Sequence, residues 1–268
     1  MGLNDLKEGE KMEEFIYKKS GGITALSANI TDFSYKNHSH SEYAIGVTKS
    51  GIQRYHLDGK LQLSYQDGIM LFNPEQVHDG MAHDKSGLEY IMLYIEPAVL
   101  LDAAERKEAI QFTTPVIYNS KIESDVYHLA NAIFHENEEE IVDEQLIKLV
   151  DDLVNQSTIR KHVESNAYIS KIKGRILYGL KVNLKITDLA HEFGMSKFQF
   201  IRYFKEQTGI TPYQFLLNSK IEEAKNIIEI DKDIHLAVSE LGFSDLTHLN
   251  RQFKKIYGIT ANNYAQSF

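Results

Sequence analysis

The N-terminal third of the chain alternates short apolar runs with turn residues. The runs cover residues 22–30, 43–48, 52–57, 60–65, 68–72 and 88–95. They are rich in β-branched and aromatic side chains, which favours strands. Asp58-Gly59 joins two of them, and such a pair indicates a tight hairpin because both residues tolerate positive φ. Short strands at this spacing predict a barrel or a sandwich.

From about Glu123 the apolar spacing changes to that of amphipathic helices. Apolar residues recur three or four positions apart on both sides of a charged segment, 135–140. Two such helices form a helical hairpin, which either packs on the barrel within the chain or pairs with its copy in a second subunit. The polar stretch 155–166 is a predicted linker.

The C-terminal region contains an internal repeat. FKEQTGIT at 204–211 returns as FKKIYGIT at 253–260, and upstream EFGMS at 192–196 returns as ELGFS at 240–244. Because the matching segments keep the same order in both copies, a whole structural unit is duplicated.

Each copy contains the cap and turn residues expected of a helix, a turn and a second helix. In the first, Thr187 is expected to cap a short helix, Gly194 to supply the turn and Ser196 to cap the next helix. In the second, Gly242 and Ser244 take the last two roles. The second helix of such a unit lies in the major groove of DNA.

The exposed face of each second helix carries the predicted base and phosphate contacts. The predicted DNA-binding residues are Phe198, Ile201, Arg202, Lys205, Leu246, Thr247, Asn250, Arg251 and Lys254. Arginine can grip guanine through two acceptors, and Lys254 is placed for a phosphate. Between the copies, Thr211-Pro212 begins a long helix. This helix fixes the distance between the two predicted DNA-contacting helices, which are called the readers below.

Residues from about 167 to 268 resemble the DNA-binding domain of the AraC/XylS family. The motifs that carry the resemblance are ITDLA at 186–190, GMS at 194–196, GITP at 209–212, LGFS at 241–244 and FKK at 253–255. The chain departs from the family at Ala261, where proline is usual, and at Leu246, where a polar base reader is common. The resemblance implies promoter DNA and RNA polymerase as partners, and activation as the commoner role.

The N-terminal half resembles the cupin-like effector domain of the same family. HSHSEY at 38–43, Asp67-Gly68, Asn73-Pro74 and His78 follow the family's order. The resemblance implies a small-molecule effector. The predicted effector-binding residues are His38, His40, Tyr43, Arg54 and His78. If Arg54 points inward, the effector is expected to carry a carboxylate.

Alternation along a strand would put the side chains at 38, 40 and 42 on one face, where His38, His40 and Glu42 could meet His78. Such a set suits a polar effector pocket, a metal ion or simple hydrogen bonding. We expect no catalytic residue, metal or cofactor. The alternative is a metal-dependent cupin enzyme or a metal sensor fused to a DNA-binding domain, and a third interpretation is a partner-controlled regulator with a filled barrel.

Charge and composition change this picture little. The net charge is −9, yet from residue 166 onward we count 14 Lys and Arg against 10 Asp and Glu, so the acid is concentrated in the N-terminal part. The chain has no cysteine, which excludes disulfides and thiolate sites. No apolar run is long enough to span a membrane, and the first residues do not resemble a secretory signal, so a cytoplasmic protein is expected.

Together these patterns predict an α+β protein of two domains. Residues 1–110 form a cupin-like, all-β effector barrel, 111–160 a helical hairpin that is a candidate dimerisation element, and 161–268 an all-α domain with two helix-turn-helix units joined by a long helix. The predicted function is that of a ligand-responsive, sequence-specific transcription regulator, an activator and a homodimer rather than an enzyme.

Overall fold

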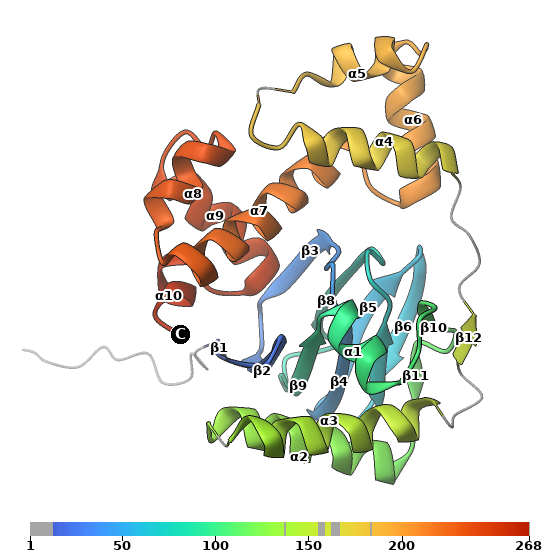
Figure 1. The fold of residues 1–268 in the computed structure, drawn as a ribbon, viewed down its shortest axis with the longest axis vertical. Helices are drawn as coiled ribbons and strands as arrows, with labels where there is room; N and C mark the ends of the chain where they lie inside the picture. Colours follow the sequence, from blue (N-terminus) through green and yellow to red (C-terminus); the bar gives the residue numbers. More distant parts are fainter. Residues whose placement is uncertain (1–12, 137, 155–158, 162–166, 183, 268) are drawn as a thin grey trace, which may run out of the picture.

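The protein is described by a computed structural model, which covers residues 13–136, 138–154, 159–161, 167–182 and 184–267 (Figure 1). The strands are β1 (Glu14–Ser20), β2 (Ile23–Ile30), β3 (Ser34–His38), β4 (Tyr43–Ser50), β5 (Gln53–Leu57), β6 (Lys60–Ser64), β7 (Ile69–Phe72), β8 (His78–Ala82), β9 (Leu88–Ile95), β10 (Ile110–Phe112), β11 (Val116–Ile117) and β12 (Ile159–Lys161). The six predicted strands are therefore present, and the barrel half of the predicted fold class is confirmed.

Two antiparallel sheets build the barrel. Their strand orders are β1-β2-β9-β4-β7-β11 and β3-β8-β5-β6, and β10 pairs separately with β12. The predicted hairpin joins β5 to β6, where Leu57 pairs with Lys60. Asp58 and Gly59 both have positive φ, as a two-residue primed turn requires.

The larger sheet is buried on both faces because its strands alternate between two apolar cores. Ile45, Leu71 and Leu93 point toward the helices α1 (Pro97–Ala103), α2 (Ser120–Phe134) and α3 (Glu139–Val154). The two long helices form the predicted hairpin, which packs on the barrel within the chain. The intrachain alternative is thus confirmed, and pairing with a second copy stays a prediction.

The barrel interior is filled largely by aromatic and methionine side chains. Tyr55, Phe72, Tyr90 and Met92 belong to one buried cluster, which Tyr17 joins on the side of the C-terminal helices. Tyr35 joins them, and its hydroxyl lies 2.6 Å from that of Tyr90. A filled interior is what the partner-controlled interpretation predicts, and it leaves the end of the barrel, not its interior, as the place for a ligand.

The C-terminal part is all helical. Its helices are α4 (Ala167–Tyr178), α5 (Ile186–Glu192), α6 (Lys197–Thr208), α7 (Pro212–Asp231), α8 (Ile234–Leu241), α9 (Leu246–Tyr257) and α10 (Ala261–Ala265). The two units, α5-α6 and α8-α9, are joined by α7, which confirms the other half of the predicted fold class.

Most of the predicted caps are present. Ser196 and Thr211 each form a complete capping box, and Gly194 and Gly242 have positive φ. Two expectations were wrong. Thr187 lies inside α5, whose N-cap is Lys185, and the cap of α9 is Asp245, whose side chain accepts from the backbone N–H of His248.

Differences between sequence and structure also occur elsewhere. The charged or polar strands β1, β3 and β8 were not predicted, because polar residues interrupt their alternation. Strand β12 lies within the predicted linker, and the rest of that linker falls outside the described residues. Ala261 in place of proline does not prevent α10, which Thr260 caps. Among the described residues we find no helix with the length and apolar character needed to cross a membrane.

The second helix-turn-helix unit shares a hydrophobic core with the barrel. Leu249, Phe253 and Tyr264 belong to the same buried cluster as the barrel residues Tyr17 and Leu26. The first unit has a core of its own. Figure 1 shows α4–α10 on one side of the barrel and α2–α3 on the opposite side. The barrel and the C-terminal helices therefore meet in a packed interface, which is called the seam below.

Candidate functional site

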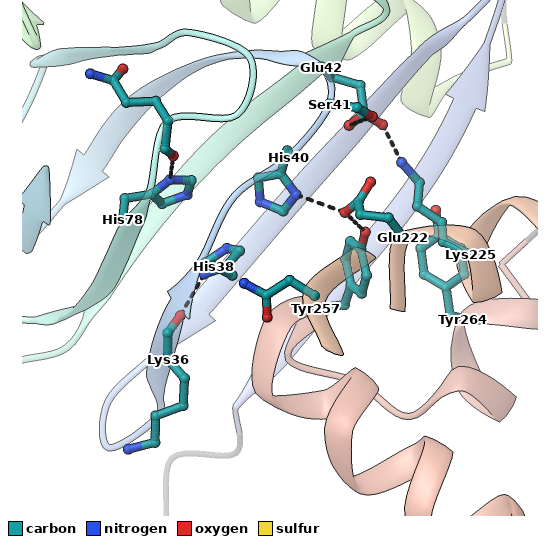
Figure 2. Close-up of polar contacts among 12 residues, drawn as sticks. Lys36, His38, His40, Ser41, Glu42, His78, Glu222, Lys225, Tyr257 and Tyr264 are labelled. Atoms are coloured by element: carbon teal, nitrogen blue, oxygen red, sulfur yellow. Dashed lines mark hydrogen bonds and ion pairs between the residues drawn. The ribbon is translucent and has the colours of Figure 1, made fainter. Parts of the chain in front are cut away.

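Three histidines meet at the end of the barrel that faces the C-terminal helices (Figure 2). His38 ends β3 and is paired with His78, which begins β8, and His40 follows in the turn before β4. The ring centroid of His38 lies 4.7 Å from that of His40 and 4.4 Å from that of His78. The centroids of His40 and His78 are 5.4 Å apart. All three side chains are buried. The predicted convergence of these histidines is therefore present, although residues 39–42 form a turn and not a strand.

Hydrogen bonds fix the orientation of the rings. Nδ1 of His38 lies 2.6 Å from the carbonyl oxygen of Lys36, and Nδ1 of His78 lies 2.8 Å from that of Gln76. A carbonyl oxygen only accepts, so each Nδ1 carries the hydrogen. Burial, reinforced by the neighbouring histidines, lowers the pKa of His38 well below its ordinary value and that of His78 to about 3. Both rings are neutral near pH 7, and each has its lone pair on Nε2.

Helix α7 brings charged side chains to the same seam. Nδ1 of His40 lies 3.4 Å from Oε1 of Glu222, which also accepts a hydrogen bond from the hydroxyl of Tyr257. One turn further, Nζ of Lys225 donates to the carboxylate of Glu42. These contacts join the barrel to the C-terminal helices by polar bonds as well as by the shared core.

The ion pair between Glu42 and Lys225 is buried, with side chains 9% and 6% exposed. Burial alone would raise the pKa of Glu42, but the attraction of the Lys225 ammonium outweighs it and lowers the pKa to about 2. Burial would also lower the pKa of Lys225, yet the carboxylates of Glu42, Glu222 and Glu229 raise it. Both partners are therefore charged at neutral pH.

Two cavities flank the histidines along the seam. One, of about 370 Å³, is lined by His56, Asp58 and His78 from the barrel and by Lys173, Glu206 and Phe215 from the helices. The other, of about 210 Å³, is lined by His40 together with residues of α4 and α7. The larger cavity falls in the range that small-molecule sites occupy.

The other two predicted effector residues lie elsewhere. Tyr43 faces the helical hairpin, on the opposite side of its sheet, where its hydroxyl donates to the carbonyl of Ile110 at 2.7 Å. Arg54 alternates with the buried Gln53 and Tyr55, so it points to the outer face of β5. The structure therefore does not group Tyr43 or Arg54 with the histidines, and it removes the basis for a carboxylate bound by Arg54 inside the barrel.

Helix α6 exposes the predicted contacts of the first unit. Phe200 and Phe204 are fully buried in the core of that unit. On the other side of the helix, Arg202 and Lys205 are exposed and Ile201 is half-buried. Phe198 is 72% exposed, an unusual state for an aromatic side chain.

Helix α9 has the same division with two differences. Thr247, Arg251 and Lys254 are exposed. Leu246 is half-buried against the core of its unit, which leaves less of it for a base. Asn250 is half-buried, and its side-chain oxygen accepts from the backbone N–H of Asn262 at 3.3 Å.

Sequence reasoning missed the charged residues of α7 at the seam. Glu222, Lys225 and Glu229 are spaced three and four apart, so they lie on one face of the helix. That face is largely buried, since Lys225 is only 5% exposed. Charged residues at helical spacing among the apolar positions of α7 were the signal that could have revealed an interface.

Comparison with known proteins agrees with this architecture. Residues 20–154 match the family model of the AraC-like ligand binding domain, and residues 189–267 match a helix-turn-helix domain. An uncharacterised HTH-type transcriptional regulator of Bacillus subtilis, YbfI, is 24% identical over 80% of this chain and 81% of its own length. LumQ of Photobacterium leiognathi, a probable transcriptional regulator, is 21% identical over 86% of this chain and 91% of its own length.

A solved structure has the same two-part fold. ToxT of Vibrio cholerae, crystallised with a bound unsaturated fatty acid, is 11% identical, superposes with a TM-score of 0.58 and covers 98% of both chains. The ligand-domain model alone spans half of this chain, and the helix-turn-helix model spans most of the C-terminal helices. The chain therefore belongs to the AraC family of transcription regulators, with a ligand-binding domain followed by a helix-turn-helix DNA-binding domain.

Proposed function

We propose that this regulator reads promoter DNA with the exposed faces of α6 and α9, and that a small molecule at the domain seam changes how the two readers engage their site. The observation that carries the proposal is that the C-terminal helices have one side packed on the barrel and another side exposed. One side of α9 and α7 packs on the barrel, while Arg202 and Lys205 on α6 and Arg251 and Lys254 on α9 are exposed.

The reader residues have separate roles. Arg202 on α6 and Arg251 on α9 are the proposed base readers, because a guanidinium can contact two acceptors of guanine. Lys205 and Lys254, near the C-terminal ends of the same helices, are proposed phosphate contacts. Phe198 is the proposed apolar contact with a thymine methyl group, which would explain its exposure.

The effector is proposed to bind in the larger seam cavity, next to His78. Its lining comes from both the barrel and the first helix-turn-helix unit, so a bound molecule touches both. A ligand shifts the balance between two domain arrangements only if it binds them with different affinity, and a site shared by two domains meets that requirement.

The test is selection of a randomised DNA duplex library on the full-length chain at moderate salt, followed by sequencing. We expect an asymmetric motif with two boxes about one helical turn, roughly 34 Å, apart. On the selected site, Arg202→Ala and Arg251→Ala should each cost about 1–3 kcal/mol, whereas Lys254→Ala should weaken all sequences alike.

Exposed residues outside the readers provide matched controls. Arg106→Ala, after α1, and Lys148→Ala, on α3, remove the same charges at exposed positions. Neither should change specificity. Equal losses on selected and random DNA for both reader arginines would contradict their role, and recovery of unenriched sequence would contradict the proposal as a whole.

We further propose a cytoplasmic activator that contacts RNA polymerase, that works as a homodimer and that has no enzymatic activity. The support is the family resemblance together with the DNA-binding domain. One apolar face of α2 and α3 packs within the chain, and α3 still exposes Ile141 and Ile147, so the hairpin remains the candidate dimer surface. Light scattering on the purified chain tests the dimer, and transcription from the selected site with and without the regulator separates activation from repression.

A further inference from the structure

We infer that His38, His40 and His78 bind a divalent transition-metal ion of the zinc type, and that Glu222 of the DNA-binding domain is the carboxylate that orients His40. This goes beyond the small-molecule effector proposed above. Only its regulatory consequence, a link between the ion and DNA affinity, rests on the proposed function.

The geometry places three ligand atoms together. One ring nitrogen from each of the three histidines lies within 4.8 Å of the other two. A tetrahedral zinc ion with Zn–N bonds of about 2.0–2.1 Å would bring such nitrogens to roughly 3.4 Å apart. Adjustments of about an ångström in the rings would close this gap, and both His38 and His78 lie at the ends of paired strands.

The hydrogen bonds prepare the rings for coordination. Histidines that bind metals usually donate their other ring N–H to a carbonyl or a carboxylate, which fixes the tautomer and the orientation of the ring. His38 and His78 have this arrangement through the carbonyls of Lys36 and Gln76. His40 has it through Glu222. All three rings are thus held by Nδ1, and the remaining nitrogen is Nε2.

The donor set indicates the class of ion. Three imidazole ligands suit zinc, copper, iron or nickel, whereas calcium and magnesium prefer oxygen ligands. Three protein ligands also leave a fourth position of a tetrahedral ion for water or for a ligand atom. The 370 Å³ cavity is lined by His78, so a molecule bound there would touch one of the three proposed ligands.

Glu222 couples the ion to the seam. An ion on Nε2 of His40 makes the opposite N–H more acidic, which strengthens its bond to the Glu222 carboxylate. Glu222 lies on α7, the helix that joins the two helix-turn-helix units. Binding of the ion therefore favours the arrangement in which α7 stays against the barrel. By reciprocity, DNA that favours or disfavours this arrangement must change the affinity for the ion by the same factor.

The experiment is titration of the untagged, chelator-treated full-length chain with Zn²⁺ alone, by calorimetry, with bound zinc counted by elemental analysis. The chain has 11 histidines, so weak surface binding needs a control. We expect one tight equivalent that His38→Gln or His78→Gln abolishes. His83→Gln, which changes an exposed histidine next to β8, should retain it.

A second pair of variants tests the role of Glu222. Glu222→Gln should weaken zinc binding by about 10–100-fold, the range found for partners of metal-bound histidines. Its neighbour Glu223 contacts Asn226 on the helix surface, so Glu223→Gln should leave the affinity unchanged. Circular dichroism of each apo variant checks that a lost site does not reflect an unfolded chain.

The outcomes separate this inference from the proposed function. Absence of a tight equivalent in the folded protein, or its retention in folded His78→Gln, would overturn the metal site while DNA selection by the apo chain left the regulator intact. One tight equivalent in a chain that selects no DNA sequence would support the metal site and contradict the proposed function. Equal zinc affinity in wild type and folded Glu222→Gln would overturn the coupling through α7.

Discussion

Removing Lys225 from its buried ion pair with Glu42 should destabilise the protein, and removing Glu42 as well should add less than the cost of Glu42 removal alone. The change is Lys225→Met, which leaves the Glu42 carboxylate buried without the ammonium that pairs with it. Glu42 has a pKa of about 2 against an ordinary 4.5, so its charged form is stabilised by about 3 kcal/mol at neutral pH. This agrees with the roughly 3–5 kcal/mol that breaking a buried pair costs.

The two single variants should differ. Lys225 is also attracted by Glu222 and Glu229, so it keeps compensation when Glu42 becomes glutamine. Lys225→Met instead leaves three carboxylates without their shared ammonium. We therefore expect Glu42→Gln to cost less than Lys225→Met, and the double variant to cost clearly less than the sum of the two.

The assay is urea unfolding of the four proteins at neutral pH, followed by circular dichroism and by tyrosine fluorescence, since the chain has no tryptophan. Coincident transitions justify a single free energy of unfolding. Additive costs in the double variant, or a loss of less than about 1 kcal/mol in Lys225→Met, would refute the reasoning, because either result would mean that the pair is not desolvated.

Three further predictions concern turns, caps and acid. Gly258→Ala should destabilise more than Gly194→Ala: both glycines have positive φ, but a Cβ at 258 would meet the Phe15 ring at 2.3 Å, whereas none of the described atoms lies within 4 Å at 194. Thermal unfolding compares them, and equal losses would contradict the Phe15 contact. Ser196→Ala should cost about 1 kcal/mol through loss of the α6 cap, again measured by urea unfolding. The pKa of His78 is about 3 in the folded chain against 6.5 ordinarily, so the unfolded chain takes up this proton first and stability should fall as the pH drops from about 6.5 toward 3. His78→Gln should reduce that slope, and an unchanged slope would contradict it.

Several features followed directly from local sequence. The hairpin at Asp58-Gly59, the capping boxes of Ser196 and Thr211 and the glycine turns of the repeat each depend on a few adjacent residues. Their physical causes are local as well: tolerance of positive φ, and side-chain oxygens that accept from the first backbone N–H groups of a helix. The repeat could be recognised from the sequence because the same cap and turn residues return in the same order in both copies.

Strand faces were harder to assign. Strands β4 and β9 carry buried apolar residues on both faces. One face meets the barrel interior and the other meets α2 and α3. Alternation alone therefore could not tell that Tyr43 faces the helices. Arg54 posed the reverse problem, since Arg54 and Tyr55 were both plausible interior residues until the register with β8 was known.

What the sequence by itself determined was six apolar strands, the helical hairpin, the duplicated helix-turn-helix unit and the order of the domains, because these depend on period, capping and turn chemistry within short windows. What only the tertiary structure decided was the seam. Glu42 and Lys225 lie 183 residues apart, and His40 and Glu222 lie 182 apart, so no local pattern pairs them. They meet because α7 packs across the barrel end, where burial of an unpaired charge would be unfavourable.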